Sequence, residues 1–472
     1  MKRSRTHSAD STFRKISFRG RPLIVGTFIL TATGLITRTI GFFYRIYLSR
    51  LFGEEGMGIY QLLSPVVALS FSLCAAAYQT AISKFVAEYA GRRNKRFQPL
   101  TVGLMISVPL SLLCCALICT QAEFIAVRLL LEPRTESMLR ILAFSIPFSS
   151  IHACINGYFY GVKKTGPPAL AQLLEQLARV GCVGLVSASA IAAGRTPSIN
   201  VAVFGLAVGE FVSMSVALVA IFRVLYDTPA RERHMLSPGR LGNSGNLVMF
   251  RSVLGMALPL TLNRIVLNVL QSVESVSIPA RLRLYGYDNA TALSVYGVLT
   301  GMAMPLIFFP NALTNSVSVL LLPLISENYA MGDMRAVKSA ILRTIKFCAV
   351  LGLFCMSSFF LLGDYIGSTL FDSALAGHFI TTLSFLCPFL YLDATLSSIL
   401  QGLGKVGTIF VMNVISLLLR LAFVFGAIPR FGITGYLWGI LTGQIVLSLL
   451  YLLCLRRFLR RHTDAALVRG SK

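Results

Sequence analysis

Charged residues are scarce in this sequence. Lys, Arg, Asp and Glu together make up 13% of the 472 residues, and only 19 residues are acidic. A soluble globular domain carries about 25% charged residues, so the composition excludes that class. Hydrophobic residues reach 55%, which indicates an integral membrane protein.

Several chemical signatures are also missing. The sequence has no GxxxxGK[ST] phosphate-binding loop, which argues against ATP hydrolysis. It has no CxxC pair and no His at ligand spacing, so we interpret the ten cysteines as apolar packing residues and expect no metal site and no cofactor. GLGKVG at 402–407 matches GxGxxG, but it joins two apolar runs with no strand before it, which predicts a turn. We therefore expect a protein that is not an enzyme.

Long apolar runs are abundant. A transmembrane helix needs roughly 20 mostly apolar residues, whereas barrel strands would be about 9 to 11 residues long with alternating polarity. Twelve runs of helical length lie at 22–48, 57–81, 98–120, 136–161, 167–193, 199–226, 250–278, 291–322, 340–362, 376–402, 406–428 and 433–458. The sequence therefore predicts an all-α integral membrane protein with about 12 transmembrane helices.

Basic residues outnumber acidic ones, and the formal net charge is +24. With the N-terminus in the cytosol, most of the 43 Lys and Arg fall on the cytosolic side, as the positive-inside rule requires. We predict that both termini are cytoplasmic and that the basic segments meet anionic membrane lipids. These segments carry no nucleic-acid motif with interleaved aromatics, so we expect no nucleic-acid partner. The first apolar run has no small-residue cleavage site after it, and we expect it to stay in the membrane.

The two halves of the chain resemble each other. A shift of 241 residues superposes Pro147 on Pro388, Gly161 on Gly402 and Arg179 on Arg420. Each half has an even number of spans, which predicts a parallel pseudo-repeat of two six-helix lobes facing each other across a cleft. The expected organisation is a basic cytoplasmic N-terminus at 1–21, an N-lobe at 22–226, a cytoplasmic linker at 227–249, a C-lobe at 250–458 and a basic cytoplasmic tail at 459–472.

Arginines interrupt the predicted spans. Arg38 and Arg45 are seven residues apart and share one helix face. Arg38 would lie past the middle of the hydrocarbon, where a midplane Arg costs about 2.5 to 3.5 kcal/mol; Arg45 either lines a cleft with it or reaches outward to the interface. Arg264, Asn268 and Gln271 form a polar stripe at helical spacing on the first span of the second half. We predict that these side chains surround a water-filled cavity that binds phosphate.

Other buried charges have more than one interpretation. Glu175 precedes Arg179 by four residues, which favours a structural ion pair. Arg420 has no acid at that spacing, so it either pairs with Asp393 or stays free for cargo. The remaining buried acids, which either bind a coupling H⁺ or Na⁺ or form structural pairs, are Glu210 and Glu274.

Three stretches carry a family resemblance. They are GLITRTIGFFYRIYLSRLFGEEGMGIYQLLSPV, TAISKFVAEYAGRR and YGVLTGMAMPLIFFPNALTNSVSVLLLPLISENYAMGD. They resemble the stage V sporulation protein B group of polysaccharide-biosynthesis membrane proteins, within the multidrug/oligosaccharidyl-lipid/polysaccharide (MOP) flippase superfamily. Lipid II flippases and MATE multidrug exporters belong to the same superfamily. The resemblance covers nearly the whole chain and is strongest in the first two spans of each half.

The resemblance implies a function and a site. It implies an alternating-access flippase that moves an undecaprenyl-diphosphate-linked sugar across the bacterial cytoplasmic membrane, for peptidoglycan, spore cortex or polysaccharide, with cell-wall synthesis enzymes as partners. Matched by motif, Arg38, Arg45 and Arg264 would contact the diphosphate. The chain departs from lipid II flippases in two ways: it has twelve predicted spans where they have fourteen, and RTIGFFYR is one residue longer than their RxxGxxR arrangement.

Other functions remain open at this point. A cation-coupled multidrug exporter of the same superfamily would place acids and aromatics in the cleft, whereas the entry spans here bring arginines. A membrane glycosyltransferase would need carboxylates in outer loops, where Glu54, Glu55, Asp364 and Asp372 form no recognisable motif. The sequence does not distinguish either from a scaffold for cell-wall enzymes without transport activity.

Overall fold

The computed structural model describes residues 21–89, 97–227 and 243–470, and within these ranges it contains helices and turns but no strand. The first half contains α1 (Arg21–Gln61), α2 (Ser64–Phe71), η2 (Ser72–Ala76), α3 (Ala77–Glu88), α4 (Gln98–Thr120), α5 (Ala122–Phe124), η4 (Ile125–Leu129), η5 (Pro133–Thr135), α6 (Glu136–Gly161), α7 (Gly166–Ala192) and α8 (Asn200–Tyr226). The second half contains α10 (Asn243–Tyr285), α11 (Asn289–Gly297), η7 (Val298–Ala303), α12 (Met304–Phe308), α13 (Asn311–Ala330), α14 (Met334–Phe371), α15 (Ala374–Leu383), η8 (Ser384–Leu386), α16 (Cys387–Gly402), α17 (Val406–Gly426), α18 (Ile428–Phe431) and α19 (Ile433–Gly470).

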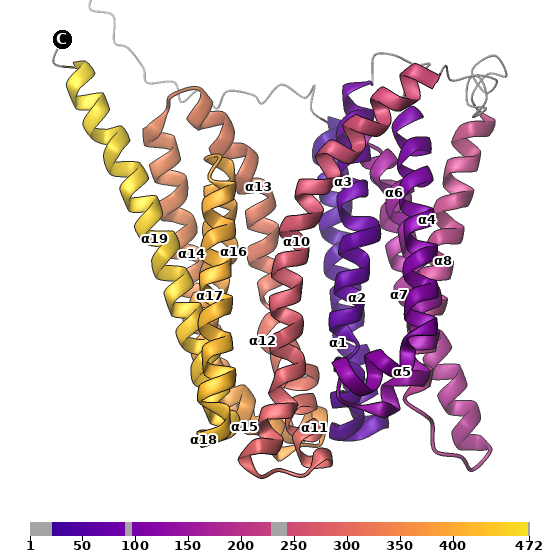
Figure 1. Ribbon diagram of the computed structural model, residues 1–472. Helices are drawn as coiled ribbons and strands as arrows, with labels where there is room; N and C mark the ends of the chain where they lie inside the picture. The colour runs from indigo at the N-terminus through magenta and orange to yellow at the C-terminus, as the bar shows by residue number, and fades with distance from the viewer. Residues whose placement is uncertain (1–20, 90–96, 228–242, 471–472) are drawn as a thin grey trace, which may run out of the picture.

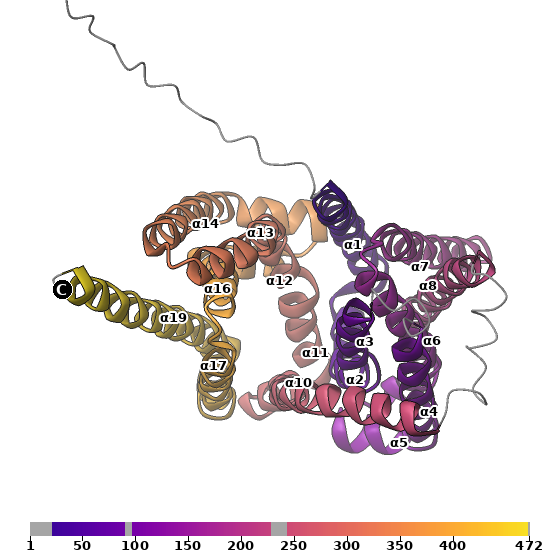
Figure 2. The same cartoon turned by 90° about the horizontal axis from the view of Figure 1, so that it is seen from above.

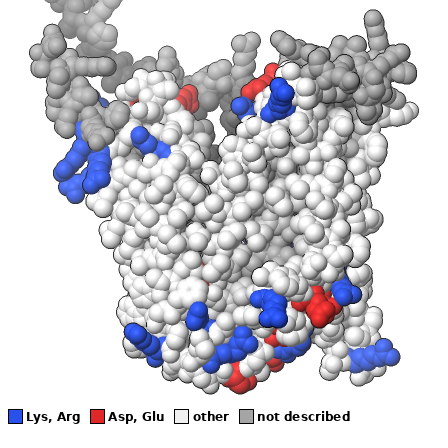
Figure 3. Space-filling view, viewed as in Figure 1, with Lys and Arg blue, Asp and Glu red and all other residues white. Residues whose placement is uncertain are grey.

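The helices have the length and surface of a membrane protein. In the described residues, 11 helices are long and apolar enough to cross a membrane, and each falls on one of the predicted apolar runs. The remaining run, 22–48, lies within the 41-residue helix α1. Charged side chains gather at the two ends of the molecule, with a wide uncharged band between them (Figure 3). The all-α membrane fold with about 12 spans is thereby confirmed.

The helices form two groups with a long helix between them. Helices α1 to α8 lie on one side, and α11 to α19 lie on the other (Figures 1 and 2). Helix α10 packs against α2, α3 and α4 of the first group and against α17 and α18 of the second. The two groups hold the helices of the predicted lobes except α10, which the sequence assigns to the C-lobe and which bridges the two groups.

Element boundaries differ from the predicted runs at a few places. Gly53 has φ 69°, a left-handed conformation that glycine adopts without strain, and it breaks α1 so that the first two spans follow each other without a loop. Of the predicted linker 227–249, residues 228–242 lie outside the described residues, and Asn243 already begins α10. The predicted N-terminus at 1–21 lies outside them almost entirely. At the other end α19 continues past residue 458 to Gly470.

The lobes touch at the end of the molecule where α11, α15 and α18 lie, which we call the closed end (Figure 1). Gly58 packs so closely on α11 that a Cβ there would overlap the Leu293 carbonyl oxygen, and a Cβ at Gly297 would overlap the Glu54 carbonyl oxygen. Two glycines therefore allow backbone to meet backbone across the lobes.

Polar contacts reinforce the closed end. The Arg50 side chain donates to the carbonyl oxygens of Leu370 at 2.9 Å and Thr369 at 2.5 Å, at the C-terminus of α14. A cation at a helix C-terminus also interacts favourably with the helix dipole. The Ser373 hydroxyl donates to the Glu54 carboxylate at 2.5 Å. Each of these bonds joins one lobe to the other.

Glu132 adds a titratable group to the closed end. Its carboxylate accepts a bond from Asn289 of the opposite lobe at 2.9 Å and pairs with Arg134 at 2.6 Å. Burial acts to raise the pKa of Glu132, but the bonds from Arg134 and Asn289 outweigh it, and the pKa is lowered. The contribution of Glu132 to stability is therefore present above the unfolded-state pKa of about 4.3 and is lost as pH falls through the lower folded-state pKa.

We expect Glu132→Gln to lower stability at pH 7 by about 1 kcal/mol, because the charge-assisted bond to Arg134 is lost. The difference from wild type should begin to shrink below the unfolded-state pKa of about 4.3, and it should vanish once pH is below the lowered folded-state pKa, where the folded wild-type carboxylate is itself protonated. Thermal unfolding of the purified wild type and variant, at pH 7 and at a series of lower pH values, measures the difference in stability. Glu123→Gln, at an exposed position, is the control. A difference that stayed constant across this range would contradict the assignment.

Candidate functional site: an arginine-lined cavity between the lobes

A central cavity of about 600 Å³ lies between the lobes. The N-lobe lines it from α1 and α7, and the C-lobe lines it from η7, α12 and α13. The polar residues that line it are Arg38, Tyr44, Arg45, Tyr60, Gln176, Arg179, Thr300, Asn311 and Asn315. Because both lobes supply its walls, a change in lobe orientation must reshape this cavity.

The charged residues that line the central cavity are all arginines: Arg38, Arg45 and Arg179. No acidic residue of the described chain is among the lining residues. Two of the lining residues, Tyr44 and Arg179, each have a buried polar atom, the hydroxyl and Nε, with no hydrogen-bond partner among the described residues. Phosphate oxygens accept several hydrogen bonds, and guanidinium groups grip them with two parallel donors. The cavity therefore suits an anion with phosphoryl groups.

A smaller cavity of about 300 Å³ continues from the central one between α1 and α13. Both cavities share Arg38 and Asn315. The smaller one is lined further by Leu30, Leu35 and Ala312, which are apolar. A ligand with a charged head and an apolar chain could thus place its head on the arginines and its chain in the space between α1 and α13.

Arg264 does not line the central cavity in this structure. It lies on α10 at a separate cavity of about 500 Å³ that also contains Lys84 and Tyr160. Helix α10 packs on α2 and α3. The predicted grouping of Arg264 with Arg38 and Arg45 is therefore wrong for this conformation.

Asn268 and Gln271 follow Arg264 on α10. The Asn268 amide donates to the Ala68 carbonyl at 3.1 Å and to the Ser72 hydroxyl at 2.6 Å, across the two lobes. This amide joins the lobes, and its donors are occupied. Gln271 is exposed on the same helix. Of these three stripe residues, Asn268 is the one for which the described residues show hydrogen bonds between the lobes.

Arg420 is paired, but with neither of its predicted options. Its guanidinium lies 2.7 Å from Glu274 of α10, and the Tyr436 hydroxyl donates to the same carboxylate at 2.9 Å. Asp393 instead accepts a bond from Ser448 at 2.6 Å and another from Gln444. Both predictions for Arg420, pairing with Asp393 and binding of cargo, are corrected by this arrangement. Glu274 is in a structural pair.

We expect Glu274→Gln to destabilise the protein by about 3 to 5 kcal/mol, because Arg420 would be left charged and unpaired in a buried site. The double variant Glu274→Leu/Arg420→Met removes both charges and should recover most of the loss. Melting temperatures of the two variants in detergent measure the difference. A double variant no more stable than Glu274→Gln would show that burial of an unpaired charge is not the cause.

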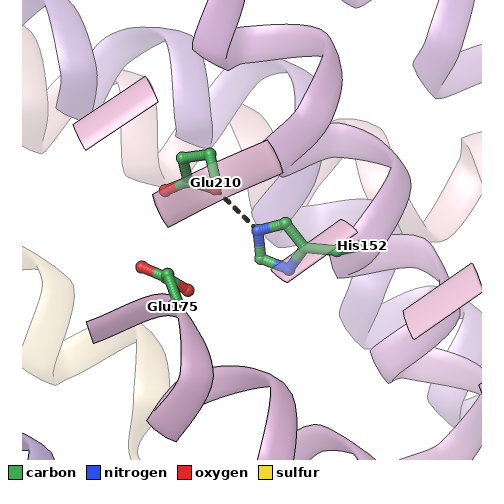
Figure 4. A group of neighbouring side chains, drawn as sticks. All are labelled: His152, Glu175 and Glu210. Carbon is green, nitrogen blue, oxygen red and sulfur yellow. Dashed lines mark hydrogen bonds and ion pairs between the residues drawn. The ribbon is translucent and has the colours of Figure 1, made fainter. Parts of the chain in front are cut away.

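The N-lobe holds a second group of charges beside the central cavity. His152 of α6, Glu175 of α7 and Glu210 of α8 offer nitrogen and oxygen atoms that all lie within 4.8 Å of one another, and we call them the N-lobe cluster (Figure 4). His152 Nε2 lies 2.8 Å from Glu210. The predicted ion pair of Glu175 with Arg179 is formed at 2.7 Å. This cluster is therefore tied to one of the arginines of the central cavity.

The N-lobe cluster has the donor types of a metal site, but its surroundings disfavour one. The Arg179 guanidinium already occupies the Glu175 carboxylate, and it would repel a second cation there. The His152 ring is engaged by Glu210. The cluster is better described as the hydrogen-bonded pair of His152 and Glu210 beside the ion pair of Glu175 and Arg179.

Several lining residues were missed from sequence. Tyr44, Tyr60 and Gln176 are single polar groups in apolar runs, and nothing in one sequence distinguishes them from packing residues. Asn311 and Asn315 had a usable signal, because they lie four residues apart, one helical turn, in an otherwise apolar run. The involvement of His152 could not be found, because it depends on a contact with another helix.

In the described residues, two lobes of membrane-spanning helices with a cavity between them form an architecture like that of alternating-access transporters. The family model described as polysaccharide biosynthesis protein matches residues 23–329, and the MatE model matches residues 254–425. The chain belongs to the polysaccharide biosynthesis protein family.

Individual proteins show the same relationship. The chain is 29% identical to stage V sporulation protein B of Bacillus subtilis (strain 168) over 90% of this chain and 82% of that protein. It is 22% identical to lipid II flippase MurJ of the same organism, over 91% and 81%. An inward-facing multidrug resistance MATE family transporter has a TM-score of 0.69 at 16% identity, covering 93% of this chain and 99% of that one. The chain is thus a multi-pass bacterial membrane protein.

Proposed function

We propose that this protein is an alternating-access flippase for an undecaprenyl-diphosphate-linked sugar, a precursor of peptidoglycan, spore cortex or polysaccharide. The observation that carries the proposal is the central cavity, whose charged lining residues are three arginines and which continues into an apolar space between α1 and α13. Such a lipid has a negatively charged diphosphate, which suits the arginines, and an apolar prenyl chain, which suits the space between α1 and α13. The similarity to stage V sporulation protein B and to a lipid II flippase supports this cargo class.

The orientation is part of the proposal. The positive-inside rule places both termini in the cytoplasm. Helix α1 begins, and α19 ends, at the end of the molecule opposite the closed end (Figure 1). The closed end would then face outward, and the structure would correspond to an inward-facing state. The basic segments at the cytoplasmic end would attract anionic lipids, and cell-wall synthesis enzymes would supply or receive the cargo.

The proposed cycle breaks no covalent bond. The diphosphate binds Arg38 and Arg45 from the cytoplasmic side while the prenyl chain stays between α1 and α13. The lobes then rock, the contact at Gly58 and Gly297 separates, and the head leaves on the other side. Direction requires a difference in affinity between the two states, the membrane potential or a coupled ion.

A cation-coupled multidrug exporter is the second candidate, because the MatE model matches residues 254–425. Its cargo would be cationic. The arginines of the central cavity oppose such a cargo by charge repulsion.

Reconstitution distinguishes the two candidates. Proteoliposomes containing the purified protein receive a fluorescent undecaprenyl-diphosphate sugar, and a membrane-impermeant reagent reports how much of it crosses the bilayer. We expect translocation of this lipid and none of a cationic drug-like dye. Translocation of the dye alone would replace the proposal with the exporter.

A further inference from the structure

We propose that Arg179 contacts the cargo diphosphate and that the N-lobe cluster binds a proton when it does so. Cargo and proton would then bind cooperatively. The inference rests on the proposed function, because it requires an anionic head in the central cavity. It gives Arg179 a role in cargo binding beyond its ion pair with Glu175.

Arg179 belongs to two sites at once. It lines the central cavity together with Arg38 and Arg45. One of its terminal nitrogens, Nη2, lies 2.7 Å from Glu175 of the N-lobe cluster. Its Nε atom is buried without a partner among the described residues. Part of its donor capacity is therefore unused, and the residue can respond to an anion in the cavity.

The cavity wall near Arg179 has a second unused donor. The Tyr44 side chain is 6% exposed and lines the same cavity, and its hydroxyl has no partner among the described residues. Buried polar groups are nearly always hydrogen-bonded, so two such atoms at one wall point to a ligand that completes them. A phosphoryl oxygen is an acceptor of the kind that each of these donors lacks.

The charges around Glu175 determine whether an anion in the central cavity favours or opposes protonation of the N-lobe cluster. The charged, titratable and hydrogen-bonding groups that face Glu175 or Arg179 are His152 of α6, Glu210 and Ser213 of α8, and Tyr44, Arg45 and Tyr60 of α1. Two carboxylates thus share a small space with one imidazole and one guanidinium. The Arg179 cation favours the ionised form of Glu175, and the Glu210 carboxylate opposes it.

Binding of a diphosphate changes this balance. Its negative charge competes with Glu175 for the Arg179 guanidinium, and the ionised form of the N-lobe cluster is then less stabilised. The cluster then takes up a proton. By linkage the reverse also holds: protonation of the cluster frees Arg179 and tightens cargo binding.

The coupling has a consequence for transport. A diphosphate diester carries two negative charges, so a complex with one added proton is still net negative. An inside-negative membrane potential therefore continues to favour outward movement of the head. Loss of the proton returns Arg179 to Glu175 and weakens cargo binding, which provides a route to release.

Calorimetry on the purified full-length protein tests the inference. The probe is a farnesyl-diphosphate-linked sugar, whose diphosphate diester does not titrate near neutral pH. Titration in two buffers of different ionisation enthalpy yields the number of protons taken up on binding. We expect proton uptake by the wild type, and an affinity that increases by up to about tenfold for each unit that pH falls.

Three variants locate the coupling. Glu175→Gln should bind the probe with little dependence on pH and with reduced proton uptake, because its side chain no longer releases Arg179 by protonation. Glu210→Gln keeps the Arg179 pair and should also reduce the uptake, because one of the two carboxylates is removed. Glu136→Gln is the matched control: it breaks the pair with Arg140, which has the same four-residue spacing and the same 2.7 Å distance on an exposed face of α6. We expect wild-type uptake from this control.

The outcomes separate the two proposals. If the wild type does not bind the probe, the phosphate-binding function itself is wrong. Binding without proton uptake would overturn only the coupling, and so would unchanged uptake in both Glu175→Gln and Glu210→Gln. If Glu175→Gln does not fold, the wild type and Glu210→Gln still decide the result.

Discussion

Replacement of both Arg38 and Arg45 by alanine is expected to abolish translocation of the lipid-linked sugar. Both side chains are exposed to the central cavity and are two helical turns apart on α1. Each charge-assisted bond to a phosphoryl oxygen contributes about 1.5 to 3 kcal/mol. Loss of two such contacts should weaken binding by about 150-fold to 20,000-fold. The reconstituted flipping assay measures the rate, and calorimetry with the farnesyl-diphosphate-linked sugar measures the affinity.

Two further variants make this result specific. Arg343→Ala removes an exposed arginine from α14, away from the cavity, and should translocate as the wild type does. Arg38→Lys keeps the charge but lacks the planar fork that grips phosphate with two bonds, so an intermediate loss is expected. If the double alanine variant reached the membrane and flipped the lipid at the wild-type rate, the cavity would not be the cargo site.

Sequence alone predicted which segments of the chain form membrane-length helices. Apolar runs of transmembrane length can be counted directly, because the hydrocarbon core demands about 20 apolar residues from each helix. Each of the 11 membrane-length helices in the described residues overlaps one of these runs. Arg38 and Arg45 were also predictable as a cavity pair, because their spacing fixes a common helix face and burial of unpaired arginine in lipid is costly.

Contacts between distant helices could not be predicted in this way. The Tyr436 hydroxyl that binds Glu274 is 162 residues away from it in the chain. Spacing rules describe neighbours on one helix, so they correctly paired Glu175 with Arg179 but could not find the partner of Arg420. The placement of Arg264 was missed for the same reason, because it depends on how α10 packs against α2 and α3.

The two repeats use one position in different ways. Arg179 and Arg420 correspond under the 241-residue shift. Arg179 pairs with an acid on its own helix and also lines the central cavity. Arg420 pairs with an acid of α10 and with Tyr436, inside the C-lobe. An arginine is thus present at this position in both lobes, but of the two only Arg179 of the N-lobe lines the central cavity.

The second large effect is expected at the closed end. Gly58→Ala places a methyl group against the Leu293 carbonyl oxygen, and no side-chain rotation can relieve a clash with backbone. Overpacking costs about 1 to 3 kcal/mol and here affects only the state in which the lobes touch. The population of that state should fall by about 5-fold to 150-fold relative to the other state, and transport should slow with it.

Accessibility measurements distinguish this mechanism from misfolding. A single cysteine at Gln176, in a background without the ten native cysteines, should react faster with an impermeant reagent from the outer side when Gly58→Ala is present. Gly255→Ala adds the same methyl group to α10, where nothing lies within 4 Å, and should change neither labelling nor transport. Normal transport by Gly58→Ala would mean that the lobes need not close tightly at this end, and the alternating-access cycle would then lack its outer barrier.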